Sequence, residues 1–139
     1  MTIFKRVKVF SLAIVVVVVA AGGEFFRQLN KEADFTLRSP KGDYLIESVT
    51  LGGILFPFHD KVFLRVVDAT RPGEAYRTPL FAASLLDMRS PFETEGELSI
   101  TWVTFHKARK SFSLGVPEWQ GTWLNLFVAN APYDITPND

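Results

Sequence analysis

The stretch Glu97-Leu-Ser-Ile-Thr-Trp-Val-Thr-Phe105 decides the fold class that the sequence predicts. Its apolar residues Leu98, Ile100 and Trp102 alternate with serine, threonine and valine at the odd positions. Alternation with a period of two places one set of side chains on a single face of a β-strand. We therefore expect one strand over residues 97–105, with one face in a hydrophobic core.

The residues after this strand predict its partner and a final element. Beyond the polar turn 106–110, alternation resumes from Phe112 to Val116 and makes the second strand of a hairpin. Pro117 ends that strand, since proline has no backbone N–H to donate. The segment Glu118–Ala129 is expected as a short amphipathic helix that buries its large apolar side chains, or alternatively as an edge strand. Those side chains are Trp119, Trp123, Leu126 and Phe127.

The residues before the strand predict further antiparallel pairs. Strands are expected over residues 62–69 and 75–81, joined by a turn that contains Pro72 and Gly73. Residues 82–88 suit a last strand or a short helix equally well. The predicted fold class is mainly β, with a single antiparallel sheet or meander, an N-terminal transmembrane or signal helix and a short C-terminal helical segment.

A hairpin is also expected where the folded domain begins. Its turn is Ser39-Pro-Lys-Gly-Asp-Tyr44, in which Pro40 presets φ and Gly42 supplies a positive φ. These six residues resemble the Ser-Pro-Asp-Gly-x-Tyr hairpin of β-propeller blades and of many small, uncharacterised bacterial exported or membrane-anchored β-domains. The consensus has Asp or Asn where Lys41 stands. The resemblance implies a lone antiparallel sheet in a short envelope protein, a class that includes immunity proteins against toxins delivered to the periplasm, and it implies no catalytic residues.

The N-terminal segment predicts export. Lys5, Arg6 and Lys8 precede an uncharged run from Val9 to Gly23, which is 15 residues long. A comfortable helical span needs about 20. The segment is therefore either a signal peptide, cleaved after the small residues at 19–21 or 21–23, or a retained anchor whose flanking cations snorkel to the interface. We expect three parts: residues 1–23 as signal peptide or anchor, 24–33 as a juxtamembrane stalk, and 34–139 as a β-rich extracytoplasmic domain.

Charge and composition bound the location and the partners. The positive-inside rule keeps the N-terminus in the cytoplasm, so the domain lies in the periplasm, tethered to the inner membrane or soluble after cleavage. Residues 24–139 carry 12 Lys and Arg against 15 Asp and Glu, which argues against nucleic acid as a partner. The chain has no cysteine, which excludes a lipoprotein anchor and disulfides.

No catalytic, cofactor or metal site is predicted. Cysteine catalysis is impossible, and no serine lies in a Gly-x-Ser-x-Gly elbow. The two histidines, His59 and His106, are expected as ordinary turn residues, because a hydrolytic or metal site also needs converging partners. Gly52-Gly53 lacks the lysine and the following helix of a phosphate-binding loop.

Three features could bind a partner: an apolar loop over 51–58, an acidic row over 93–97 and a basic hairpin tip over 107–110. Alternatively, the loop covers the core or dips toward the membrane, and the charged segments are solvated turns. The candidate contact residues are Ile54, Phe56, Phe58, Glu93, Glu95, Glu97, Lys107 and Arg109.

We therefore expect a non-enzymatic extracytoplasmic protein-binding module. Its most concrete form is an immunity protein that neutralises a toxic effector in the periplasm. The alternatives are a structural subunit of an envelope complex, a small-ligand-binding domain or a hydrolase. The partners expected are a protein and, if the anchor is uncleaved, the inner membrane.

Overall fold

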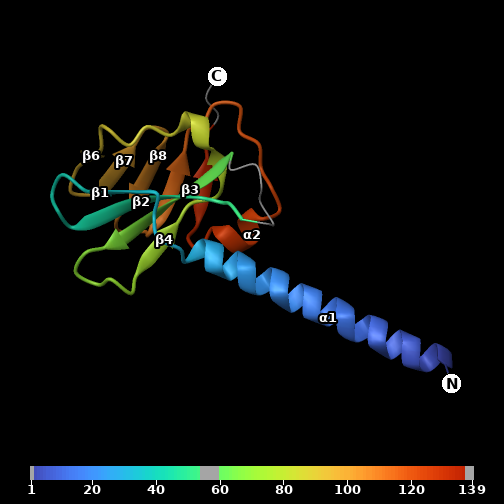
Figure 1. Ribbon diagram of the computed structural model, residues 1–139. Helices are drawn as coiled ribbons and strands as arrows, with labels where there is room; N and C mark the ends of the chain where they lie inside the picture. Colours follow the sequence, from blue (N-terminus) through green and yellow to red (C-terminus); the bar gives the residue numbers. More distant parts are fainter. Residues whose placement is uncertain (1, 54–59, 137–139) are drawn as a thin grey trace.

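The computed structural model describes residues 2–53 and 60–136, which form a β-sandwich attached to one long helix (Figure 1). Helix α1 runs from Thr2 to Leu29 and projects away from the domain. The mainly β class that the alternation predicted is confirmed. The described strands form two five-stranded sheets, where a single sheet was expected.

The strands of each sheet are consecutive in the sequence. The first sheet contains β1 (Phe35–Arg38), β2 (Tyr44–Thr50), β3 (Lys61–Asp68), β4 (Ala75–Arg77) and β5 (Phe81–Ala82). The second sheet contains β6 (Phe92–Glu93), β7 (Glu97–Ile100), β8 (Val103–His106), β9 (Ser111–Leu114) and β10 (Tyr133–Ile135). The 3₁₀ helix η1 (Ala83–Leu85) links the sheets, and the short helix α2 (Asn125–Val128) precedes β10.

The first sheet has the order β1-β2-β3-β4, and β5 pairs with the start of β3. The predicted β1–β2 hairpin is present, and Gly42 adopts a φ of +84° in its turn. The Ser39 hydroxyl oxygen accepts a hydrogen bond from the amide of Tyr44 at 3.1 Å, which closes the turn. The expected 75–81 strand is divided, because residues 78–80 separate β4 from β5.

The second sheet has the order β10-β9-β8-β7-β6, and β10 is parallel to β9 while the other pairs are antiparallel. The prediction of one strand over 97–105 was wrong. A tight turn at Thr101 and Trp102 divides it into β7 and β8, and Thr101 has a φ of +48°. The turn reverses the chain, so Ile100 and Val103 pair and both are buried.

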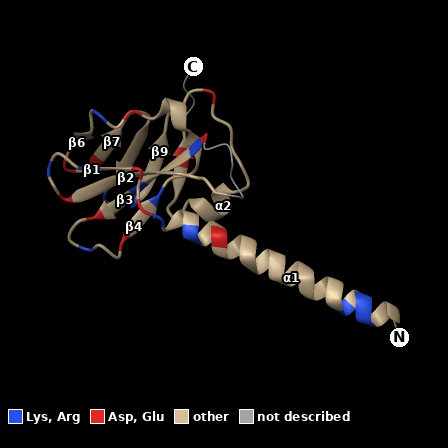
Figure 2. Cartoon of the chain, viewed as in Figure 1, with Lys and Arg blue, Asp and Glu red and all other residues tan. Residues whose placement is uncertain are grey.

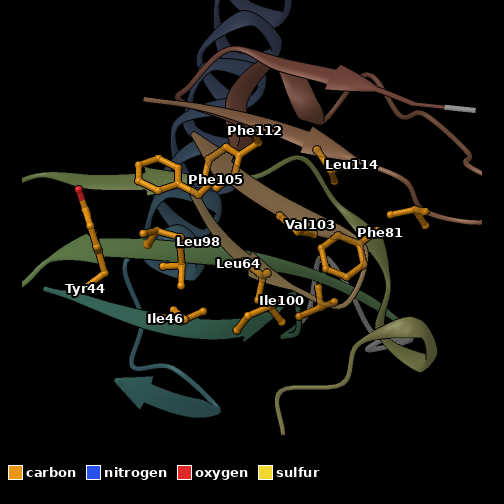
Figure 3. Close-up of a cluster of buried hydrophobic side chains, with 13 residues drawn as sticks. Tyr44, Ile46, Leu64, Phe81, Leu98, Ile100, Val103, Phe105, Phe112 and Leu114 are labelled. Atoms are coloured by element: carbon orange, nitrogen blue, oxygen red, sulfur yellow. The ribbon is translucent and has the colours of Figure 1, made fainter. Parts of the chain in front are cut away.

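The main hydrophobic core lies between the two sheets, as Figure 3 shows. Inward side chains from both sheets meet there, including Phe105 of β8 and Phe112 of β9, whose ring centroids are 5.1 Å apart. Aromatic residues bury large apolar areas, and this packing holds the domain without disulfides. The buried members are Tyr44, Ile46, Val62, Leu64, Val66, Phe81, Leu98, Ile100, Val103, Phe105, Phe112, Leu114 and Val116.

A second cluster lies on the outer face of the first sheet. Val49 and Phe63 point there, because successive strand residues face opposite sides. Leu29 at the end of α1 and Val128 of α2 cover them. The first residues of the segment 24–33, which is expected as a stalk, continue α1 as far as Leu29, and Leu29 packs on the sheet.

The C-terminal segment differs most from expectation. Helix α2 has four residues, and it buries Asn125 and Val128. Leu80 donates its amide to Oδ1 of Asn125 at 2.8 Å, so the polar side chain faces the sheet. The prediction that this segment buries its large apolar side chains was wrong for three of the four, since only Trp119 packs against the core; the three exposed ones are Trp123, Leu126 and Phe127.

Candidate functional site

The turns at one end of the sandwich hold most of the charged residues that the sequence singled out. We define this distal end by residues 39–43, 69–74, 94–96 and 107–110, together with the strand ends that they join. Figure 2 shows its acidic and basic residues gathered away from α1. The structure brings five of the predicted contact residues together here: Glu93, Glu95, Glu97, Lys107 and Arg109.

Glu93 is at the centre of this end, and its side chain is 0% exposed. Its carboxylate accepts hydrogen bonds from the Lys41 backbone amide at 2.6 Å and from Nζ of Lys107 at 2.9 Å. Burial raises the pKa of Glu93, but the hydrogen bonds from Lys107, the Lys41 amide and the Ser39 hydroxyl outweigh burial and hold the pKa below its ordinary value. Since Lys41 lies in the β1–β2 turn, Glu93 joins the two sheets.

Lys107 has a mainly structural role, because its ammonium holds the buried carboxylate of Glu93. Its ammonium also donates to the carbonyl oxygen of Thr94 at 2.7 Å, and its side chain is 13% exposed. The basic tip predicted from the sequence thus loses one of its charges to an interior ion pair. A buried charge needs such partners because removal from water is costly.

Glu95 and Arg109 remain accessible. The side chain of Glu95 is 96% exposed, although it pairs with Nζ of Lys41. The hydrogen bond with Lys41 lowers the pKa of Glu95, and the same bond raises the pKa of Lys41. Arg109 is exposed at the tip of the β8–β9 turn. Glu95 and Arg109 are thus accessible to a partner at the distal end, whereas Glu93 and Lys107 are not.

Lys110 forms a feature that sequence reasoning missed. Its ammonium lies 5.7 Å from the ring centroid of Tyr44, 5.6 Å from that of Tyr76 and 6.0 Å from that of Phe105. Such contacts with ring faces stabilise a cation. Desolvation by burial, together with the hydrogen bond to Glu74, raises the pKa of the Tyr76 hydroxyl. No local signal could have predicted this site, because the rings come from β2, β4 and β8.

A polar stripe crosses the outer face of the second sheet. Ser113 Oγ lies 2.7 Å from Nε2 of His106, and Nδ1 of His106 lies 3.3 Å from Oε1 of Glu97. This is the order of nucleophile, base and orienting carboxylate found in serine hydrolases. Glu97 of β7 lies directly opposite His106 of β8, and Ser113 of β9 is the diagonal neighbour of His106; such polar pairs also stabilise a sheet face. His106 therefore has partners, where an ordinary turn histidine was expected.

An oxyanion hole would have to come from backbone amides near Ser113. Strands β8 and β9 are each paired on both sides, so their ladders use these amides. The stripe thus has side chains in the order that a serine hydrolase uses. The backbone amides around it are already hydrogen-bonded within the sheet, so they do not form an oxyanion hole. Among the described residues, no cluster of three or more His, Asp or Glu side chains could hold a metal ion.

A shallow groove lies beside η1, on the side where β9 leads into the loop before α2. It has a volume of about 220 Å³ and is lined by Phe81, Val116 and Trp119. Small-molecule sites are commonly about 300–1,000 Å³. The groove is therefore small for the ligand-binding alternative.

The apolar loop cannot be placed with these surfaces. Ile54, Phe56, Phe58 and also His59 lie outside the described residues. Within the described part of the chain, α1 is the one helix long and apolar enough to cross a membrane, a property that signal sequences share. Comparisons with protein-family models, curated proteins and solved structures found nothing that matches this chain.

Proposed function

We propose that this protein is a membrane-anchored, extracytoplasmic protein-binding module that presents its distal end to a partner. The observation that carries the proposal is the attachment of α1 to the sandwich. Arg65 of β3 donates from Nη1 to the carbonyl oxygen of Leu29 at 3.0 Å and from Nη2 to that of Lys31 at 3.1 Å. These carbonyls lie at or just beyond the end of α1, where intrahelical partners run out and a cation is favoured.

Two further contacts fix this attachment. Gly52 donates its amide to Oε1 of Gln28 at 3.1 Å, and Leu29 is buried in the second cluster. Arg65 also pairs with Glu47 on the neighbouring strand β2. A helix held in this way orients the sandwich and does not tether it loosely. The distal end then lies away from the membrane that α1 would cross.

Retention of α1 as an anchor is part of the proposal. Both candidate cleavage positions, after Ala21 and after Gly23, lie inside a helix that continues without a break to Leu29. The basic residues before the apolar run support a cytoplasmic N-terminus and a periplasmic domain. Extraction of membranes with alkaline carbonate tests this part, because an anchored chain of full mass stays with the membrane and a cleaved chain is released.

The partner we propose is a protein, and most concretely a toxic effector delivered to the periplasm. The resemblance of the Ser39–Tyr44 hairpin to small envelope domains favours this class, and the accessible charges of Lys41, Glu95 and Arg109 offer a polar contact surface. A structural subunit of an envelope complex is the alternative within the same class. Protection of cells against the effector separates the two, because a structural subunit gives none.

The experiment that tests binding uses the full chain in mild detergent, with partners identified by mass spectrometry. Glu95→Lys and Arg109→Glu should each weaken capture of a specific partner. Glu118→Lys is the matched control, because Glu118 is exposed but lies outside the distal end. A partner captured equally well by all four chains would refute the distal end as the contact surface.

The polar stripe favours a hydrolase as a second candidate function. A fluorophosphonate probe tests it directly, because such probes label serine only when a base activates it. Labelling of the wild type that is lost in Ser113→Ala and in His106→Gln would support a hydrolase. An unlabelled protein would leave the stripe with a structural role.

A further inference from the structure

Three large apolar side chains face solvent on α2 and on the turn before it. This α2 patch consists of Trp123, Leu126 and Phe127, which are 71%, 81% and 58% exposed. The rings of Trp123 and Phe127 meet edge to face, with centroids 6.2 Å apart. Clustered exposure of this kind marks an interaction surface, whereas single exposed apolar residues are normal.

The patch is continuous with α1. The Phe127 ring meets Phe25 of α1 edge to face, with centroids 6.3 Å apart. Phe26, the next residue of α1, is 68% exposed. Figure 1 shows α2 beside the last turns of α1. The last turns of α1 and the α2 patch are therefore exposed to the same medium, either water or lipid.

The length of the apolar run places this level of α1 at a membrane interface. The 15 uncharged residues from Val9 to Gly23 extend about 22 Å at roughly 1.5 Å each, against a hydrocarbon core of about 30 Å. A short span draws its flanking residues toward the bilayer. Glu24 and Arg27 form a bidentate pair at 2.7 and 2.8 Å, which suits charged groups in the headgroup region.

We infer that the α2 patch inserts into the headgroup and upper acyl region of the bilayer that α1 crosses. The inference rests on the proposed retention of α1 as an anchor. Lipid fits the patch because tryptophan is enriched at membrane interfaces and phenylalanine and leucine enter the acyl boundary. The distribution of charge agrees, since the acidic and basic turns lie away from α1 (Figure 2). The domain thus rests on the membrane by its apolar end.

Contact with the bilayer also explains why α2 turns its polar side chain inward and its apolar side chains outward. Its polar Asn125 is turned inward to bind the amide of Leu80, which leaves Leu126 and Phe127 directed outward. In a domain surrounded by water this arrangement exposes apolar area at a cost in stability. In contact with a bilayer, the outward apolar side chains are favourable, because lipid and not water surrounds them.

The test uses the full-length chain in vesicles of phosphatidylcholine and phosphatidylglycerol. Trp102→Phe with Trp119→Phe leaves Trp123 as the single fluorophore. The matched control replaces all three tryptophans with phenylalanine and adds Phe92→Trp, because Phe92 is similarly exposed, at 66%, but lies on β6 beside the distal end. We expect Trp123 emission to shift to the blue, to be quenched by lipids brominated on their acyl chains and to be shielded from acrylamide. The control should show the opposite response.

Three other outcomes would each overturn the inference. In the first, the protein floats with the vesicles, but Trp123 is quenched by acrylamide and not by brominated lipid. This result keeps α1 as an anchor and refutes the contact between the α2 patch and lipid. Protein that does not float refutes the anchor itself. Trp123 shielded from acrylamide without quenching by brominated lipid, in chains that cross-link as dimers, assigns the patch to a second copy.

Discussion

Replacement of Arg65 by alanine should detach α1 from the sandwich and destabilise the domain. The guanidinium donates to two carbonyls at the end of α1 and pairs with Glu47, and the side chains of Arg65 and Glu47 are 13% and 19% exposed. Removing one member of a largely buried pair costs about 3–5 kcal/mol, because the remaining charge stays desolvated. Water can replace the guanidinium at the carbonyls, so we expect about 3–4 kcal/mol in all.

Urea unfolding of the full chain in detergent, followed by tryptophan fluorescence, measures this loss. A double-mutant cycle with Glu47→Ala isolates the ion pair and should return a coupling of about 1.5–3 kcal/mol. Arg65→Ala that costs less than about 1 kcal/mol would refute the reasoning, since that value is typical of an exposed ion pair.

Rigidity at the helix junction gives a second and independent measurement for Arg65→Ala. The chain has no cysteine, so Gly22→Cys and Gly73→Cys accept spin labels without background, and a side chain at either position meets nothing within 4 Å. The distance distribution between these labels should be narrow in the wild type and broad in Arg65→Ala. Equal widths would contradict the attachment that we describe, even if stability falls.

Three further predictions concern the same junction and the distal end. Phe63→Ala empties the centre of the second cluster and should cost about 3–5 kcal/mol in urea unfolding. Gly53→Ala should cost more than about 1 kcal/mol, because Gly53 has a φ of +80° and a methyl group would lie 2.7 Å from Oε1 of Glu24; Gly73→Ala, which meets nothing, should be close to neutral. Stability should fall as pH drops through the lowered pKa of Glu93, because protonation removes its ion pair, and Glu93→Gln should lose this part of the pH dependence.

Short-range patterns explain which parts of the fold the sequence predicted. The β1–β2 hairpin followed from Pro40 and Gly42, which are sufficient to set a turn. The β7–β8 turn at Thr101 and Trp102 contains no glycine, proline, asparagine or aspartate, so nothing in composition separated it from a strand. A change of phase was the remaining signal: Ile100 and Val103 are both apolar although they are three positions apart.

Contacts between residues far apart in the sequence explain the features of the distal end that could not be predicted. Acidic and basic rows were predicted as exposed surfaces, but the burial of Glu93 depends on Lys41, which is 52 positions away in sequence. The contact of Lys110 with three aromatic rings depends equally on the packing of two sheets. Local charge patterns identify groups that can reach solvent, and they do not reveal which groups the fold then pairs internally.

The two arginines on the outer face of the first sheet connect α1 with the α2 patch. Arg65 and Arg77 face each other across β3 and β4, where like charges repel, and burial together with Arg65 lowers the pKa of Arg77. Each is compensated by the end of a helix: Arg65 by the end of α1, and Arg77 by the Val128 carbonyl of α2 through a 2.8 Å hydrogen bond. At the end of the long helix α1, the partial negative charge of the C-terminus also favours the cation. One cross-strand pair thus fixes both helices on the same sheet, so the direction of α1 and the position of the α2 patch are set together.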